Sequence, residues 1–277
     1  MPELPEVEFI RRQLELNIAG KRIIRAELLR PGLAPKVSPH EFSEKLSGKT
    51  ITTVLRRGKF LIFKLSGKQI LAVHLRMTGK FSLLAADEEL PKHTHALFEL
   101  QGKQLLVFSD QRHFGRMILS RGNDISAIYE LASLAPEPFQ ETFHLDDFRF
   151  LLRRSQRPIK EFLLDQTKVC GLGNIYAAEA LFRAGIHPAT KTSSIGPVRS
   201  RRLYQAILET VSAAISELPG RDFFSLRPVT QNYSETNRAE WLVYAREGQA
   251  CHNCRAKIKS LRQGGRTTYF CPFCQKK

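Results

Sequence analysis

Four cysteines near the C-terminus have the spacing of a metal site. They form two pairs, Cys251-x2-Cys254 and Cys271-x2-Cys274. Each pair can present two thiolates to one tetrahedral ion, and the segment between the pairs can fold as a β-hairpin. A set of free thiols is the alternative, but it gives no reason for the paired spacing. Because four thiolates leave no coordination position open, the pattern predicts one structural zinc ion.

The cysteine segment is also strongly basic. Its predicted hairpin has strands at residues 257–261 and 267–270, joined by a glycine-containing turn at residues 263–266. No acidic residue lies between Cys251 and Lys277, and the cationic side chains there are Arg255, Lys257, Lys259, Arg262, Arg266, Lys276 and Lys277. A zinc-held hairpin with an arginine at its tip can be placed in a DNA groove.

The N-terminus could carry covalent chemistry. Pro2 is small enough to permit removal of the initiator Met1, which would expose a secondary amine. A free α-amino group has a pKa of about 7.7–8, so part of it is unprotonated near neutral pH. Such an amine can attack a sugar C1′ and form an iminium, with Glu3 beside it as acid or base. The alternative is a proline in the first turn of a helix, which fits most proteins that begin in this way.

A tight turn at residues 171–176 (GLGNIY) opens a predicted helix. Free main-chain N–H groups at a helix N-terminus suit a phosphate. A turn that only joins two packed helices is an equally good interpretation of this segment taken alone.

The charge balance favours a polyanionic partner. The 277 residues include 43 Lys and Arg against 27 Asp and Glu, a formal net charge of +16. Nucleic acid is the usual partner for such a surplus, although the charge could serve solubility alone. An anionic membrane surface is a third option, but no basic amphipathic anchor is evident. We see no apolar stretch near the roughly 20 residues of a membrane span and no signal peptide, so we expect a cytoplasmic protein in a reducing compartment.

The hydrophobic pattern changes near the middle of the chain. A helix is predicted at residues 3–17, followed by short strands typical of a β-sandwich or barrel. The predicted strands are residues 22–29, 50–55, 60–65, 69–75, 81–84, 95–100, 104–109 and 116–120. After a linker at residues 135–138 the period becomes helical. The predicted helices are residues 146–155, 158–165, 175–184 and 197–218, and a long loop is predicted at residues 221–240.

The sequence resembles the bacterial formamidopyrimidine-DNA glycosylase family, which is related to endonuclease VIII. Matching segments follow the family's order across nearly the whole chain. They are residues 2–8 (PELPEVE), 57–61 (RGKFL), 74–79 (HLRMTG), 112–115 (RHFG), 159–166, 171–176 and 264–267 (GGRT). The resemblance implies a multidomain α+β protein. Its parts are an N-terminal β-sandwich with an N-terminal helix at residues 1–125, a helix–two-turn–helix domain at 138–225 and a four-cysteine zinc ribbon at 241–277.

The resemblance also implies catalytic roles. Pro2 matches the nucleophile that forms a Schiff base, and Glu3 matches its general acid and base, with Glu6 close to the same end. Lys59 matches a phosphate-contacting lysine that assists catalysis, and Arg266 matches a phosphate clamp beside the extruded nucleotide. On its residues alone, Lys59 would read better as a lysine at a strand end.

Further DNA contacts follow from the same resemblance. Asn174 matches the second phosphate clamp, and His74 and Tyr244 match other backbone contacts. Lys160 matches a lysine near the lesion pocket, for which a solvated helix face is the alternative. The remaining matches are Met77, Arg112 and Phe114, which fill the space left by a flipped base. Core packing is the alternative for Met77 and Phe114, although Met77 precedes a Thr78-Gly79 turn, where a core residue is less expected.

The implied activity is base-excision repair on double-stranded DNA with damaged bases or abasic sites. We expect a monomeric DNA glycosylase with abasic-site lyase activity, acting on 8-oxoguanine and formamidopyrimidines by β- and δ-elimination in the bacterial cytoplasm, at the nucleoid. The family pattern of two glycines with Ser or Thr is broken at residues 216–223, where one glycine remains and the hydroxyl residues are absent. Two alternatives therefore stay open: a family member that prefers oxidised pyrimidines or only ring-opened purines, and a damaged-DNA-binding protein without catalysis.

Overall fold

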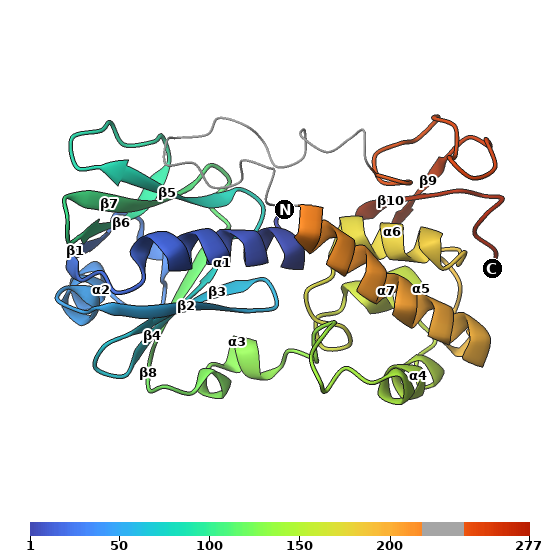
Figure 1. Ribbon diagram of the computed structural model, residues 1–277, viewed down its shortest axis with the longest axis horizontal. Coiled ribbons are helices and arrows are strands. Elements are labelled where there is room, and N and C mark those ends of the chain that lie inside the picture. The colour runs from blue at the N-terminus through green and yellow to red at the C-terminus, as the bar shows by residue number, and fades with distance from the viewer. Residues whose placement is uncertain (218–240) are drawn as a thin grey trace. The chain divides into compact units, whose positions relative to one another are not determined.

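The computed structural model describes residues 1–217 and 241–277 (Figure 1). The described chain divides into two units, Met1–Ala132 and Ser133–Glu217 with residues 241–277. The predicted loop at residues 221–240 and most of the 216–223 segment lie outside the described residues. In the part of the chain that is described, no helix is both long and apolar enough to cross a membrane.

The first unit is a sandwich of two antiparallel four-stranded sheets. In sheet order, one contains β1 (Ile23–Leu28), β6 (Thr94–Leu100), β7 (Gln104–Asp110) and β5 (Gly79–Ala85). The other contains β2 (Ile51–Arg57), β3 (Phe60–Leu65), β4 (Gln69–His74) and β8 (Arg116–Arg121). The ring centroid of Phe81 on β5 lies 5.5 Å from that of Phe63 on β3, which belongs to the other sheet, and 5.2 Å from that of Phe108 on the neighbouring strand β7. Aromatic rings therefore pack between the two sheets. The predicted β-sandwich is confirmed.

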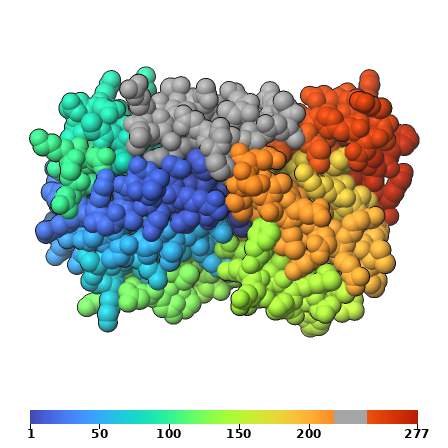
Figure 2. Space-filling view, viewed as in Figure 1, coloured from blue at the N-terminus to red at the C-terminus, as the bar shows by residue number. Residues whose placement is uncertain are grey.

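Helix α1 (Leu4–Ile18) is held along the edge strand β2. Its buried stripe at spacings of three and four includes Val7, Ile10, Leu14 and Ile18. The carboxylate of Glu15 accepts hydrogen bonds from the main-chain N–H of Val54 and the hydroxyl of Thr53. An exposed strand edge offers unpaired main-chain groups, and Glu15 satisfies one of them. The outer face of α1 stays exposed, as Figure 2 shows.

A second helix of this unit, α2 (Pro39–Leu46), was not predicted. Its local signals are present in the sequence: Ser38 accepts the N–H of Glu41 at 3.1 Å, and Pro39 occupies the first turn. Phe42 and Leu46, four residues apart, are buried on one face. The helix is short, so two apolar residues complete its inner face and no longer period is visible. The smaller elements of this unit are η1 (Pro31–Leu33), η2 (Ile125–Ala127) and α3 (Tyr129–Ala132).

The second unit begins with helices and ends with the cysteine ribbon. Its helical elements are α4 (Leu145–Arg153), α5 (Ile159–Leu164), α6 (Asn174–Arg183), η3 (Thr192–Ser194) and α7 (Pro197–Glu217). Helices α6 and α7 pack on each other. Gly185 follows α6 with φ +65°, the left-handed conformation in which a glycine commonly ends a helix.

The ribbon hairpin consists of β9 (Lys259–Gln263) and β10 (Arg266–Phe270). Gly264 and Gly265 both have positive φ, which a two-residue type I′ turn requires, and Gln263 pairs with Arg266. The first strand therefore lies two residues later than predicted, because the tight turn keeps Gln263 in the ladder. Beyond the hairpin, Gln275 donates to the carbonyl of Ile186 at 2.9 Å, which ties the ribbon to the helices.

Candidate functional site

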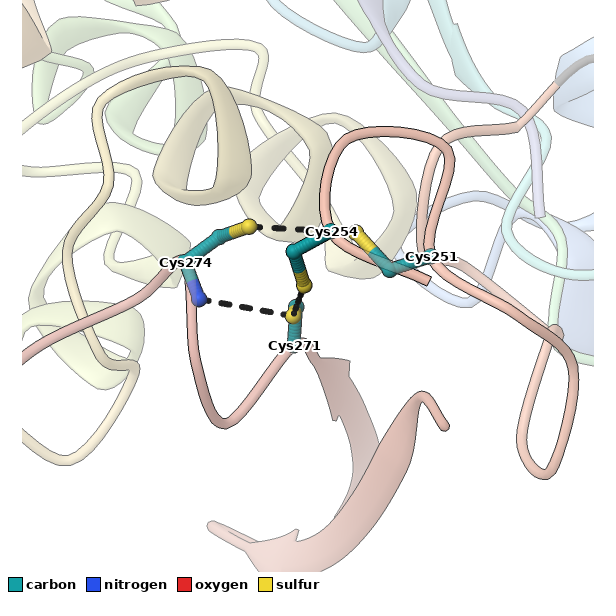
Figure 3. Close-up of side chains that lie close together, drawn as sticks. All are labelled: Cys251, Cys254, Cys271 and Cys274. Carbon is teal, nitrogen blue, oxygen red and sulfur yellow. Dashed lines mark hydrogen bonds between the residues drawn. The ribbon is translucent and has the colours of Figure 1, made fainter. Parts of the chain in front are cut away.

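The four cysteine side chains converge on one point (Figure 3). Their sulfur atoms all lie within 4.8 Å of one another, with Cys251 to Cys274 at 3.8 Å and Cys254 to Cys271 at 3.4 Å. Four thiolates on a tetrahedral zinc, each about 2.3 Å from the metal, would be about 3.8 Å apart. Hydrogen bonding from the main chain of Ala256 is the main cause that lowers the pKa of Cys254 to about 7, whereas burial raises the pKa of Cys271 and of Cys274. Deprotonation of the whole set therefore depends on the positive charge of a bound metal ion. The chain holds one structural zinc ion at these cysteines.

The zinc centre fixes the ribbon against α6. Cys251 and Cys271 are fully buried, in one cluster with Ala178 and Phe182 of α6 and with Val243. The fifth cysteine, Cys170, is buried and is not part of a disulfide. Because all four ligand positions belong to protein sulfurs, the metal supports the fold and leaves no site for substrate.

Asn174 and the ribbon turn are joined directly. The Asn174 side-chain amide, at the first residue of α6, donates to the carbonyl of Thr267 at 2.9 Å. Arg266, the neighbour of Thr267, has an exposed side chain. The two predicted phosphate clamps are therefore held next to each other, on a helix N-terminus and a strand end.

Lys160 takes a different position from that of a solvated lysine. It is fully buried, and its ammonium donates to the carbonyl of Asn174 at 2.8 Å. The alternative of a solvated helix face is therefore wrong. The contact places a positive charge behind the first turn of α6.

Tyr244 is anchored by an acid that the sequence analysis did not single out. The buried carboxylate of Glu179 accepts three main-chain N–H groups, from Leu242 at 2.8 Å and from Val243 and Tyr244 at 3.0 Å. Glu179 stands in the largely apolar run Ile175–Phe182 of α6. An acid on an otherwise buried helix face was the available signal, because a buried carboxylate requires donors.

The N-terminal pair lies at the start of α1. Pro2 and Glu3 are both buried, and Glu3 is the residue that caps the helix. The main-chain N–H of Glu3 donates to the carboxylate of Glu6 at 2.8 Å. Glu6 thus fixes the backbone between the two residues predicted to carry the chemistry.

Lys59 and His74 lie at the ends of neighbouring strands. Lys59 is buried just before β3, and His74 ends β4, where its ring contacts Phe60 edge-on at 4.7 Å. Burial, followed by the charges of Arg76 and Lys59, lowers the pKa of His74 to about 3. Its Nδ1 accepts the N–H of Arg76 at 2.9 Å, so the neutral ring carries its proton on Nε2. A neutral Nε2–H is a donor suited to a phosphate oxygen.

The three predicted gap-filling residues meet on the surface. The guanidinium of Arg112 lies 3.0 Å from the sulfur of Met77 and 5.0 Å from the ring centroid of Phe114. Met77 is 41 % exposed and Phe114 53 % exposed. Core packing is therefore wrong for both, and the three side chains form one exposed cluster of two apolar groups and a cation.

The comparisons with known proteins agree with this set of parts. Residues 1–117 match the formamidopyrimidine-DNA glycosylase N-terminal domain, residues 134–222 its helix–two-turn–helix domain, and residues 248–277 the zinc finger found in these enzymes and in isoleucyl-tRNA synthetase. A sandwich, a helix–two-turn–helix unit and a zinc ribbon in this order define a DNA glycosylase. The chain belongs to the formamidopyrimidine-DNA glycosylase family.

Similarity extends over full-length relatives. The chain is 40 % identical to the formamidopyrimidine-DNA glycosylase of Pelotomaculum thermopropionicum, over all of this chain and 99 % of that protein. It is 38 % identical to the Bacillus subtilis protein of that name, over the whole of both chains. A complex of the Lactococcus lactis enzyme with DNA containing an abasic site matches with a TM-score of 0.90 and 37 % identity, covering 99 % of this chain and 100 % of that one.

Membership in this family makes the chain a DNA-repair enzyme. It is a DNA glycosylase with abasic-site lyase activity, and the alternative of a binding-only protein is not supported. Its sandwich unit carries the Pro2, Glu3, Lys59 and His74 positions, whereas Asn174 belongs to the other unit.

Proposed function

We propose that the enzyme excises oxidised purines through a Schiff base on Pro2. The observation that carries this proposal is the buried Pro2-Glu3 start of α1, held by Glu6. Removal of Met1 frees the Pro2 nitrogen, whose lone pair attacks C1′ of the damaged nucleotide. The C1′–N bond to the base breaks, and the base leaves with a proton.

Strand cleavage follows from the same intermediate. Loss of the Pro2 proton and opening of the sugar give an iminium, which acidifies the C2′ hydrogen. Glu3, as general acid and base, assists the proton transfers. β-Elimination expels the 3′ phosphate, and δ-elimination then expels the 5′ phosphate. Hydrolysis of the iminium returns the Pro2 amine.

The cationic and amide side chains serve the DNA backbone. We assign phosphate contacts to Lys59, His74, Asn174 and Arg266, and a further backbone contact to Tyr244. Arg266 is supported by its exposure at the ribbon turn and Asn174 by its bond to the adjacent Thr267. Lys160 acts through Asn174, whose carbonyl it contacts.

Met77, Arg112 and Phe114 fill the gap left by the flipped nucleotide. Flipping costs about a few kcal/mol, because stacking and pairing are lost. Apolar side chains and one cation that enter the vacated space offset part of this cost. The exposed cluster of the three side chains supports this role.

The substrates are 8-oxoguanine and formamidopyrimidines, with oxidised pyrimidines as a second candidate. The second candidate is favoured by the altered sequence at residues 216–223. The Lactococcus lactis relative has been solved with DNA containing an oxidised pyrimidine. We place the enzyme, as a monomer, at the nucleoid in the bacterial cytoplasm.

Borohydride trapping on a lesion panel tests the proposal. The duplexes carry 8-oxoguanine, a formamidopyrimidine, an oxidised pyrimidine or an abasic site. We expect a covalent adduct on the peptide that begins with Pro2, and much less of it with Glu3→Gln. Intact mass should show that Met1 has been removed. Absence of any adduct, or attachment elsewhere in the wild type, would refute the mechanism, and the ranking of the panel decides between the two substrate classes.

A further inference from the structure

The gap-filling set, Met77, Arg112 and Phe114, is carried by two separate connections. Met77 lies between β4 and β5, and Arg112 and Phe114 lie between β7 and β8. Each connection passes from one sheet of the sandwich to the other. Nothing in the local sequence links them, so their relative position depends on what joins the two connections.

One buried carboxylate joins them. Asp110, the last residue of β7, is 1 % exposed. Its Oδ1 accepts the hydroxyl of Thr78 from the first connection and the N–H of Arg112 at 3.2 Å from the second. Its Oδ2 accepts the N–H of Gly115 at 2.6 Å. The Arg112 N–H also reaches the Thr78 hydroxyl oxygen at 3.1 Å, which closes the network.

The two connections also rest on one aromatic ring. A methyl group added to Gly79 would lie 2.9 Å from the Phe108 ring, and one added to Gly115 would lie 2.7 Å from it. Both distances are shorter than van der Waals contact, so each backbone lies directly on Phe108. The Phe108 ring prevents either connection from moving further inward, and the hydrogen bonds to the Asp110 carboxylate prevent the two connections from moving apart.

We propose that Asp110 is a positioning residue for the gap-filling set. It holds Arg112 and Met77 in register before DNA binds, so that the three side chains enter the duplex as one preformed wedge. Ordering two loops only on binding would cost conformational entropy that a preformed wedge avoids. This role rests on the proposed function, because a wedge is needed only where a base is flipped out of the duplex stack.

The test compares duplex with single-stranded substrate. A single strand leaves no gap in a duplex stack to fill, and Pro2 chemistry on an abasic site needs no wedge. The reaction on a single strand should therefore not depend on the gap-filling set. We expect Asp110→Ala to slow single-turnover excision from a lesion duplex by about tenfold or more, and borohydride trapping on a single-stranded abasic oligonucleotide by less than about twofold. Ser109→Ala is the matched control, because it removes a neighbouring buried hydroxyl that has no hydrogen-bond partner, and it should change neither rate.

A double-mutant cycle isolates the mechanism. In a background of Met77→Ala, Arg112→Ala and Phe114→Ala, adding Asp110→Ala should change duplex excision by less than about twofold. Thr78→Val, which keeps the shape and removes the hydroxyl, should reproduce part of the duplex defect. Thr78→Ser, which keeps the hydroxyl, should excise from the duplex at the wild-type rate. If Asp110→Ala unfolds the protein in a thermal scan, the Thr78 pair of variants carries the same comparison.

Two results would overturn the proposal. One is an equal loss on single-stranded and duplex substrates, and the other is a full Asp110 or Thr78 defect that persists in the background without the wedge. Either would mean that the network supports the fold alone. Failure of the wild type to form any adduct would instead count against the proposed function and is read from the same experiment.

Discussion

The side-chain amide of Asn174 donates to the carbonyl of Thr267 at 2.9 Å, although the two residues belong to the helical part and to the zinc ribbon. This bond places the first turn of α6 next to Arg266. The zinc ion supports the same arrangement, because its cysteines cluster with residues of α6 and so hold the ribbon against that helix. The metal therefore helps to hold a helix N-terminus and an arginine together.

Removal of zinc should weaken DNA binding while the sandwich stays folded. We expect Cys271→Ser, or chelation, to release the metal and to lower affinity for a lesion duplex by about tenfold or more, because the ribbon loses its scaffold. Metal analysis and a fluorescence binding titration measure the two effects. Cys170→Ala is the control, since it alters a buried thiol outside the cluster and should retain zinc. Normal binding by zinc-free protein would contradict this role.

Arg266→Ala should weaken binding through the loss of one phosphate contact. The slope of log affinity against log salt should become shallower by about one unit, and affinity at moderate salt should fall roughly tenfold. Arg255→Ala, which removes another exposed ribbon arginine, serves as the comparison and should lower the affinity for the lesion duplex by less. Unchanged affinity of Arg266→Ala at moderate salt would remove it from the site.

His74 should make stability depend on pH. The folded pKa is about 3, below the ordinary value of 6.5, so below pH 6.5 the unfolded chain binds a proton that the folded chain does not. Stability should therefore fall as the pH is lowered from 6.5 towards 3, by a few kcal/mol in total (~1.4 kcal/mol per pH unit). Urea unfolding across this range measures the slope.

His74→Gln is the matched variant for this prediction. It keeps a neutral side chain with a hydrogen-bond donor, so unfolding should become less dependent on pH between 6.5 and 3. Its DNA affinity near neutral pH should stay closer to the wild type than that of His74→Ala. An equally steep pH dependence in His74→Gln would assign the effect to another group.

Glu179 should matter for Tyr244 more than its sequence position suggests. Glu179→Ala leaves three main-chain N–H groups without their acceptor and should destabilise the protein by about 1–3 kcal/mol. DNA affinity should fall as well, because Tyr244 loses its anchor. Thermal unfolding and binding titration measure both effects, with Glu209→Ala on α7, which removes an exposed acid, as the comparison. Equal effects of the two variants would argue against a specific anchor.

Part of this protein is determined by short-range sequence. The cysteine pairs predict zinc because each pair of ligands is local and the hairpin between them is closed by two glycines. The sandwich strands follow from their hydrophobic pattern and turns. Helix α2 was missed despite the cap at Ser38, because two buried residues give too short a period to detect.

Other features depend on the tertiary structure. Asp110 meets Thr78 from a different connection, and Glu179 meets main-chain groups of residues 242–244 on a distant segment. The proton state of His74 depends on burial and on neighbouring cations. A carboxylate or an imidazole in a sequence does not show whether it will be buried or which donors will surround it. Desolvation and hydrogen bonding are set by residues that are distant along the chain, so only the folded protein decides them.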